Sequence, residues 1–459
     1  MDRIIIVGGG VSGLSLAYLL HTHTPSLDII VLEAEERLGG KIWTDKTEGF
    51  LCEGGVNGFL NNKPRTLELA AALSLTPIKS NDAARKRFIF SEGRLHPLPE
   101  SPPAFFKSDL LSIWGRLRIV YEMFAPRGRK EDESLAEFGR RRLGREAFEK
   151  LIDPMASGIY AGDPESLSLK SCFPRIHQLE TEYGSLIRAL LKLQMKAKRE
   201  GRSGPGPGPG GVLTSFYDGM ETFILALKAS LGERVRSRSK VMSLEGRRDH
   251  FTLALEDGSI MESDGVVMAA PAHASSKILR DFDQALARSL SEIPYPRVSV
   301  VCLGYKKEKL GRSLDGFGFL VPFREGRRIL GTLWDSSIFP NRAPEGYVLL
   351  RTMLGGARAP HLAMQDEKRL VNTVSAELGE IMGLKAQPDF ARVYIHEKAI
   401  PQYTLGHQGR LETMERLLSR YRGLYLAGNS YRGISVNDCI ENSYRLAGQL
   451  TGETETKGA

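Results

Sequence analysis

Three glycines near the amino terminus have the spacing of a dinucleotide-binding turn. The run IIIVGGGVSGL places Gly8, Gly10 and Gly13 in a GxGxxG pattern directly after an apolar stretch. The first glycine permits a tight turn, the second lets backbone approach a pyrophosphate, and the third lets a helix pack closely on the strand. The amino terminus of that helix would face the phosphate charge. The pattern therefore predicts a site for the pyrophosphate of a dinucleotide.

An acidic residue follows at the position where such a site holds a ribose. Glu33 ends the next apolar stretch, about 20 residues beyond Gly13. A carboxylate there accepts hydrogen bonds from ribose hydroxyls and disfavours a 2′-phosphate. Both NAD and FAD fit these residues, and the structural alternative is a glycine-rich turn that binds nothing.

Other kinds of reactive site are not indicated by the sequence. The four cysteines form no CxxC pair, and the nine histidines show no metal-ligand spacing, so we predict neither a metal site nor a disulfide framework. No local motif marks a Ser/His/Asp arrangement. We therefore assign no catalytic side chain, and a bound cofactor is expected to carry the chemistry.

Hydrophobic periodicity predicts the elements that hold the glycines and Glu33. Residues 4–7 and 29–33 read as buried strands around a helix at 13–20, which is the opening of a doubly wound sheet. Strands predicted for the same domain come much later in the chain, at 235–244, 251–255, 265–270 and 424–427. A turn at Gly428 and Asn429 and a helix from about 437 to 450 follow the last of them.

The rest of the chain reads as two further parts. Residues 98–200 have a helical and basic pattern, which ends in the stretch SGPGPGPGG at 203–211, predicted to be a flexible loop. A mixed sheet with helices is predicted between about 295 and 400, with strands at 298–305, 318–321, 329–334 and 347–353 and a helix near 366–382.

Composition and charge limit the class of protein. With 459 residues, 41% hydrophobic and 26% charged, the chain has enough apolar material for two or three globular domains. The net charge of +8 is spread widely and accompanies no nucleic-acid-binding motif, so no nucleic-acid partner is expected. No apolar run approaches the roughly 20 residues of a membrane span. The first strand begins too early for a signal peptide, so we expect a reducing, intracellular location.

The continuation EAEERLGGKIWT distinguishes FAD from NAD. It resembles the ExxxRxGG element of the amine oxidase and protoporphyrinogen oxidase superfamily of flavoproteins. The resemblance implies that FAD is the cofactor and that its phosphates and ribityl chain are held by Arg37, Gly39 and Gly40.

Two distant segments resemble further parts of the same FAD site. SDGVVMAAPAHAS resembles the strand that closes the nucleotide domain in these flavoproteins, and Val241 corresponds to the backbone that holds adenine. GLYLAGNSYRGISVNDCIENSYRLAG resembles the second FAD element, with Gly428 and Asn429 beside the ribityl chain and Val436 at the isoalloxazine. Many superfamily members have an acid where this chain has Asn429, which changes the local charge. A helix beginning near Val436 would stabilise negative charge on reduced flavin.

Six blocks resemble the protoporphyrinogen oxidase family in particular. They are GFLCEGGVNGFL, RFIFSEGRLHPLP, SGIYAGDPESLSLKSCFP, DGFGFLVP, GTLWDSSIFPNRAP and AGNSYRGISVNDCI. The resemblance implies that the substrate protoporphyrinogen IX lies against Arg87, Asn57, Phe317, Leu320, Leu333, Met353 and Gly158. Arg87 would bind a propionate through its planar guanidinium. Without the resemblance, Arg87 reads as a solvated charge and the apolar members as ordinary core residues.

The implied reaction is oxidation of protoporphyrinogen IX to protoporphyrin IX in heme biosynthesis. Hydride would pass from a meso carbon to FAD, and dioxygen would reoxidise the flavin and release hydrogen peroxide. Three such cycles remove six electrons, and the sequence designates no protein general base. The rivals are a coproporphyrinogen III oxidase, an amine oxidase or desaturase on the same fold, and a flavin- or tetrapyrrole-binding protein without activity.

Residues 102–124 have the composition of a helix or helix pair in a membrane interface. Ten apolar or aromatic residues accompany three basic ones, Lys107, Arg116 and Arg118. The apolar ones are Phe105, Phe106, Leu110, Leu111, Ile113, Trp114, Leu117, Ile119, Val120 and Tyr121. The alternative is a helical domain that buries them in its own core. Relatives in the family are peripheral membrane proteins, so we expect membrane association.

The expected fold is α/β, with a Rossmann-like FAD-binding domain, a mixed α/β substrate domain and an α-helical membrane-binding insertion. The FAD-binding domain would comprise residues 1–85, 212–290 and 405–459, the substrate domain 86–97 and 291–404, and the insertion 98–211. The resemblance also implies a protein bound peripherally to the cytoplasmic face of the inner membrane and allows a homodimer.

Overall fold

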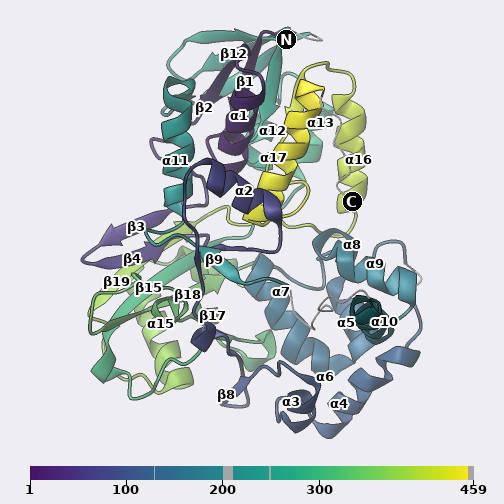
Figure 1. Cartoon of the computed structure of the whole chain (residues 1–459), viewed down its shortest axis with the longest axis vertical. Helices are drawn as coiled ribbons and strands as arrows, with labels where there is room; N and C mark the ends of the chain where they lie inside the picture. The colour runs from purple at the N-terminus through teal and green to yellow at the C-terminus, as the bar shows by residue number, and fades with distance from the viewer. Residues whose placement is uncertain (129, 200–209, 248–249, 453–459) are drawn as a thin grey trace.

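The computed structural model describes residues 1–128, 130–199, 210–247 and 250–452. The predicted flexible loop at 203–211 lies almost entirely outside these ranges. Figure 1 shows a sheet with its helices in the upper half of the view, a second sheet at lower left and a group of helices at lower right.

A five-stranded parallel sheet gathers strands that are far apart in the chain. Its order is β10-β2-β1-β14-β20. The strands are β1 (Arg3–Val7), β2 (Asp28–Leu32), β10 (Val235–Arg236), β14 (Gly265–Met268) and β20 (Leu424–Leu426). The apolar runs predicted at 4–7, 29–33, 265–270 and 424–427 are confirmed as strands, and they are buried because layers cover both faces.

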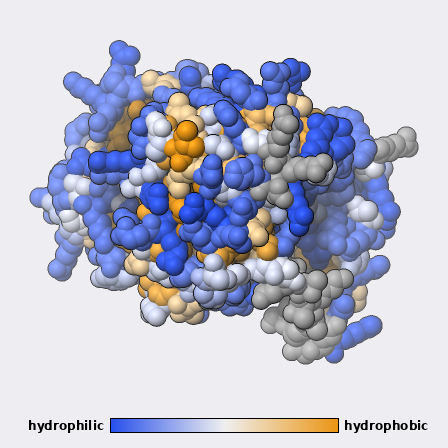
Figure 2. Space-filling model, turned by 90° about the horizontal axis from the view of Figure 1, so that it is seen from above, coloured by the Kyte–Doolittle hydropathy of each residue, from blue (hydrophilic) through white to orange (hydrophobic). Residues whose placement is uncertain are grey.

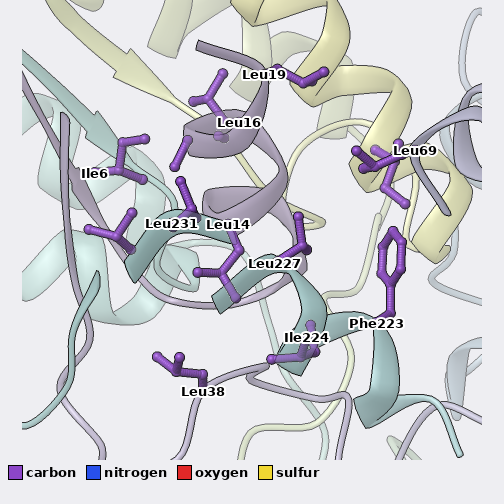
Figure 3. Packing of buried hydrophobic residues seen from close by; sticks show 14 of the residues in the cluster. Ile6, Leu14, Leu16, Leu19, Leu38, Leu69, Phe223, Ile224, Leu227 and Leu231 are labelled. Carbon is purple, nitrogen blue, oxygen red and sulfur yellow. The ribbon is translucent and has the colours of Figure 1, made fainter. Parts of the chain in front are cut away.

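Side chains of β1 alternate between the two covering layers. Ile4 and Ile6 belong to the core beneath α1 (Val11–His23), α2 (Pro64–Ala72), α11 (Glu221–Leu231) and α17 (Val436–Thr451), part of which Figure 3 shows. Ile5 and Val7 belong to the core on the opposite face. That face is covered by α12 (Ala272–Ile278), α13 (Gln284–Ser291), α16 (His407–Leu418) and a three-stranded sheet of β11 (Val241–Arg247), β12 (His250–Leu255) and β13 (Ile260–Ser263).

The single strand predicted at 235–244 is wrong. The chain leaves the parallel sheet after Arg236, turns, and begins β11 in a different sheet at Val241. Arg238 has a φ of 53° in this turn, and its N–H donates to the Glu35 carbonyl. The N–H of Ser239 donates to the carbonyl of Glu33, so these backbone bonds replace a continuous ladder.

A seven-stranded mixed sheet forms the second part, as the sequence predicts. Its order is β19-β15-β18-β17-β16-β7-β8, and only β16 and β7 pair in parallel. The strands are β7 (Arg87–Ser91), β8 (Arg94–Pro97), β15 (Val298–Lys306), β16 (Gly318–Leu320), β17 (Ile329–Leu333), β18 (Tyr347–Gly355) and β19 (Phe390–His396). Helix α15 (Glu367–Met382) packs on one face. Short strands β3 (Thr44–Thr47), β4 (Phe50–Glu53), β5 (Phe59–Leu60), β6 (Ile78–Lys79) and β9 (Leu213–Ser215) form two small sheets.

Helices make up the third part, which the pattern at 98–200 predicts. They are α3 (Pro102–Lys107), α4 (Ile113–Val120), η2 (Tyr121–Phe124), α5 (Leu135–Leu143), α6 (Arg145–Ala147), α7 (Asp153–Tyr160), α8 (Leu169–Cys172), α9 (Pro174–Tyr183) and α10 (Leu186–Arg199). A buried ionic network joins them, in which Arg142 contacts both Glu122 and Glu180. The carboxylate of Glu122 also accepts hydrogen bonds from the first N–H groups of α10.

Candidate active site

The three motif glycines form a turn that tolerates no side chain at two of its positions. Gly8 has a φ of 120°, and a Cβ there would lie 2.7 Å from the backbone nitrogen of Ala270. A Cβ on Gly13 would lie 2.0 Å from the Gly8 carbonyl oxygen, so helix and strand pack as the motif requires. Around Gly10 there is open space within 4 Å, which leaves its backbone approachable. No side chain caps the amino terminus of α1.

Glu33 directly follows β2 and fixes the edge of this turn. One carboxylate oxygen accepts the N–H of Gly9 at 2.7 Å, and the other accepts the N–H of Glu35 at 3.0 Å. The turn that leads into Val241 runs beside Glu33 through the backbone bond from Ser239. The structure therefore brings Val241, at the start of β11, to the same side of the site as Glu33.

Arg37 builds the loop that follows Glu33. Its guanidinium donates to the carbonyls of Leu38, Gly40 and Ile42 at 2.7–2.8 Å. Gly39 forms a bridge with Gly10, which brings the two glycine-rich segments together. The predicted contact of Arg37 with phosphate stays a prediction, because these three bonds occupy much of its donor capacity.

The second glycine turn lies at the carboxyl end of β20. Gly428 has a φ of 108°, and among the described residues none accepts a hydrogen bond from the N–H groups of Asn429 or Ser430. Helix α17 begins at Val436, as predicted within one residue, and its cap is Ser435, whose hydroxyl accepts the N–H of Asp438. The free N–H groups of the turn favour an anionic ligand here, whereas the amino terminus of α17 is already capped by Ser435 and Asp438.

A cationic cluster that sequence reasoning missed lies beside the glycine turns: Lys41 and Lys398, with the uncharged imidazoles of His273 and His396 next to them. The ammonium of Lys41 has no anionic partner among the described residues, and burial followed by repulsion from Arg37 lowers its pKa. Burial, with repulsion from Lys398 and Lys41, lowers the pKa of His273 to about 4. Burial, followed by repulsion from Lys41, also lowers the pKa of His396, whose Nε2 donates to the Gly54 carbonyl at 2.7 Å. With both imidazoles uncharged, the positive charge is that of Lys41 and Lys398, and it suits a pyrophosphate.

Lys41 could have been found from sequence, because it follows Gly39 and Gly40 in the quoted run. No local signal marks His396.

The seven-stranded sheet places four predicted substrate residues on one face. Arg87 pairs in register with Gly318, and Gly318 with Leu333. Two residues further along these strands, Leu320 and Met353 both pair with Gly331. Residues two apart on a strand share a face, so Arg87, Leu320, Leu333 and Met353 lie on the face opposite α15. All but the exposed Arg87 are only half-buried.

The remaining predicted substrate residues border the same face. The guanidinium carbon of Arg87 lies 5.2 Å from the centre of the Phe317 ring, a cation–π contact that orients the arginine. Gly158 on α7 faces Leu320, since a Cβ on Gly158 would lie 2.7 Å from a methyl group of that leucine. Helix α7 therefore covers part of the sheet face.

Asn57 lies on a loop whose backbone accepts a hydrogen bond from a buried arginine. Arg351 on β18, almost fully buried, donates to the Gly55 carbonyl at 2.9 Å and pairs with Asp335 at the same distance. Both polar atoms of the Asn57 amide are buried without a hydrogen-bond partner among the described residues. A buried amide without partners is costly unless a ligand satisfies it.

Comparison with known proteins assigns the chain to a family. Residues 11–451 match the family described as flavin containing amine oxidoreductase. The chain belongs to this family. As a member of the flavin containing amine oxidoreductases it is an FAD-dependent oxidoreductase, and the glycine turns, open backbone N–H groups and cationic cluster fit a dinucleotide with a charged pyrophosphate.

Three relatives show how far the similarity extends. Protoporphyrinogen oxidase 1 of Arabidopsis thaliana chloroplasts is 35% identical, over 96% of this chain and 87% of the relative. Coproporphyrinogen III oxidase of Bacillus subtilis (strain 168) is 30% identical over 96% of both chains. A crystal structure from Exiguobacterium sp. 255-15, of a provisionally named protoporphyrinogen oxidase, has a TM-score of 0.83 at 27% identity and 99% coverage of both chains.

In the ranges that the structure describes, no three His, Cys, Asp or Glu side chains are grouped to hold a metal ion.

Proposed function

We propose that the protein oxidises protoporphyrinogen IX to protoporphyrin IX in heme biosynthesis, with dioxygen as the final acceptor and hydrogen peroxide as the second product. The carrying observation is the half-buried apolar row on the open face of the seven-stranded sheet, which ends in Arg87. An apolar macrocycle with acidic side chains fits this combination. Relatives named protoporphyrinogen oxidase support the choice of substrate.

Each of the residues on this face has a role in the proposed reaction. Arg87, aligned by Phe317, would bind a propionate, while Leu320, Leu333 and Met353 would contact the pyrrole rings and exclude water. The unpaired amide N–H and carbonyl oxygen of Asn57 would form hydrogen bonds with the substrate or the cofactor. FAD supplies the two-electron oxidant, so three rounds and three molecules of dioxygen account for the six electrons.

Both glycine turns would bind the cofactor. We assign the pyrophosphate to Gly8, Gly10, Gly13, Gly40 and the neighbouring Lys41, with Arg37 and Gly39 shaping the loop. Glu33 would accept the ribose hydroxyls, with the adenine beside Val241. Gly428, Asn429 and the start of α17 at Val436 would face the ribityl chain and the isoalloxazine.

Coproporphyrinogen III is the second candidate substrate, because the Bacillus subtilis relative matches 96% of both chains. Coproporphyrinogen has more carboxylates to satisfy, and the open sheet face offers one arginine, Arg87, among the predicted substrate residues. Side-by-side turnover of the two substrates by the purified protein tests the choice. We expect kcat/KM at least about tenfold higher for protoporphyrinogen; the reverse ratio assigns the protein to the other substrate, and turnover of neither contradicts both.

We also propose that α4 and η2 dock on a membrane surface. Seven large apolar side chains in this region are exposed, Trp114 to 80% and Phe124 to 67%; the others are Phe106, Ile113, Leu117, Val120 and Tyr121. By contrast, Figure 2 shows a mainly hydrophilic surface at the opposite end of the molecule, the upper end in Figure 1. So large a group of exposed apolar residues indicates an interaction surface.

Parts of the predicted membrane contact are wrong in detail. Leu110 and Leu111 are buried within the helical part. Arg116 and Arg118 turn inward, where they donate to the carbonyls of Ser108 and of Arg141 and Arg142. Of the three basic residues, only Lys107 has no hydrogen-bond or ionic partner among the described residues, so its ammonium could contact lipid headgroups.

In the ranges that the structure describes, no helix is long and apolar enough to cross a membrane. We propose peripheral binding at the cytoplasmic face of the inner membrane as the form of association. The homodimer stays a prediction, which sedimentation analysis of the purified protein would test.

A further inference from the structure

We propose that Tyr403 and His407 are positioning residues that fix the second flavin-binding turn by hydrogen bonds on its side away from the flavin. The proposal rests on the assignment of Gly428–Val436 to the flavin and adds two residues that the glycine motifs do not contain. We define these two side chains as the clamp.

Both side chains of the clamp donate a hydrogen bond to a backbone carbonyl of the turn. The hydroxyl of Tyr403 donates to the Asn429 carbonyl at 2.6 Å, and Nε2 of His407 donates to the Tyr431 carbonyl at 2.9 Å. The two rings stack with centroids 4.2 Å apart and planes inclined by 17°. Both side chains are at most 1% exposed, so water cannot replace either bond.

The two bonds set the direction of the N–H groups in the turn. No described peptide bond is cis, and in a trans peptide the N–H points opposite to the carbonyl. With the Asn429 carbonyl turned towards Tyr403, the N–H of Ser430 is turned away from the clamp. Among the described residues, that N–H has no acceptor, and Ser430 is buried. A buried donor held in this way is prepared for a ligand acceptor.

The helical part of the molecule anchors the clamp on its other side. The N–H of Ser168 donates to the Tyr403 carbonyl at 2.9 Å, and the carboxylate of Asp132 accepts the N–H of Gly406 at 2.8 Å. Leu167 and Thr404 form a β-bridge between these two bonds. A segment fixed at both ends by backbone bonds cannot relax freely when the turn is strained.

His407 is suited to act as a neutral donor. Burial lowers its pKa to about 4, and the charged side chains of Arg410 and Arg432 oppose its protonation while Asp132 favours it. The Tyr431 carbonyl can only accept, so the neutral ring carries its proton on Nε2, and its other ring nitrogen has no hydrogen-bond partner among the described residues.

Removal of single donors from the full-length holoprotein tests the clamp. Tyr403→Phe keeps the stacked ring but leaves the Asn429 carbonyl without its donor. We expect the Kd for FAD to rise about tenfold, and at saturating FAD the visible flavin spectrum and midpoint potential to shift. Tyr421→Phe is the control, because it removes a tyrosine hydroxyl that donates to Asp283, at 2.9 Å, and not to a carbonyl of the turn. It should lower thermal stability without changing the flavin.

A second pair of variants covers the case in which Tyr403→Phe does not fold. His407→Gln retains an N–H donor towards Tyr431, whereas His407→Leu retains none. Recovery of the wild-type spectrum and potential by Gln but not by Leu supports the clamp. Equal behaviour of both variants overturns it, as does a Tyr403→Phe protein with unchanged FAD affinity, spectrum and potential.

A substitution in the turn itself separates this proposal from the proposed site. If Gly428→Val abolishes FAD binding while the clamp variants do not affect the flavin, only the clamp is wrong. If Gly428→Val leaves FAD binding unchanged, the turn does not contact the cofactor and the assignment of the site is wrong as well.

Discussion

Arg87 carries the charge on which recognition of the proposed substrate depends. It is exposed at the end of the apolar row and is oriented by Phe317. Arg87→Ala should raise KM for protoporphyrinogen by about 10–100-fold, since a hydrogen bond to a charged group contributes about 1.5–3 kcal/mol, while kcat changes less. Steady-state kinetics with the purified protein measures the effect.

Arg85 provides the matched control, because it is the same residue type, also exposed, two positions earlier. An equal rise in KM for Arg85→Ala would show that general surface charge, rather than a defined propionate site, attracts the substrate.

His407 should make stability depend on pH at the acid side. Burial lowers its pKa from 6.5 to about 4, so between these values the unfolded chain binds a proton that the folded chain does not. Above about pH 6.5 the buried imidazole therefore does not lower the free energy of unfolding. As pH falls from 6.5 towards 4, that free energy decreases by up to about 1.4 kcal/mol per pH unit. Denaturant unfolding across this range should give a shallower dependence for His407→Gln. An identical dependence in both proteins would contradict a neutral buried imidazole.

Among the elements, the turn between β1 and α1 has the least tolerance for change. A Cβ on Gly13 would meet the Gly8 carbonyl at 2.0 Å, so Gly13→Ala must displace helix or strand. We expect loss of bound FAD, measured as the flavin-to-protein absorbance ratio after purification.

Gly409→Ala is the control for this substitution, because a Cβ within α16 at that position meets nothing within 4 Å. It should retain FAD and gain about 0.5–1 kcal/mol of stability through higher helix propensity. Retention of FAD by Gly13→Ala would contradict the placement of the pyrophosphate.

Sequence predicts the elements whose burial is uniform. Strands at 4–7 and 424–427 and the helix at 366–382 agree with β1, β20 and α15 within one residue at each end, because continuous or periodic apolar runs define them. Strand β19 was missed, since its alternating burial is weak and its pairing with β15 spans a long stretch of chain. The single strand at 235–244 failed because backbone bonds to Glu33 and Glu35 break the ladder.

The same distinction applies to the site. Glycine motifs are local in sequence and can be predicted with their mechanism. The common face of Arg87, Leu333 and Met353 depends on the register of strands far apart in the chain, so only the family resemblance pointed to these residues. The cationic cluster and the clamp depend on tertiary contacts that leave no local pattern.

At the scale of the whole molecule, the exposed apolar residues of α4 and η2 predict binding to lipid vesicles. Phe124→Ser and Trp114→Ser should each weaken binding by roughly tenfold or more, because burial of one large apolar side chain contributes about 1.5–3 kcal/mol. Flotation with vesicles that contain anionic lipid measures the bound fraction. Ile260→Ser is the control, since Ile260 is as exposed as Phe124, at 68%, but lies in the part that carries the glycine turns. Equal losses for all three variants would contradict a defined docking face.

The molecule joins its helical part to the part that carries the glycine turns where the chain passes from 403 to 407. There the helical part contacts the segment that holds the second glycine turn, beside the entry into α16. The turn that we assign to the cofactor and the helices that we propose for membrane contact are therefore linked through this segment.

Anaerobic addition of protoporphyrinogen IX to the purified holoprotein tests the central proposal most directly. If the open sheet face binds this substrate beside FAD, the flavin absorbance should bleach as protoporphyrin fluorescence appears, and admission of dioxygen should restore the absorbance with release of hydrogen peroxide. A flavin that stays oxidised in the presence of excess substrate would contradict the proposed reaction.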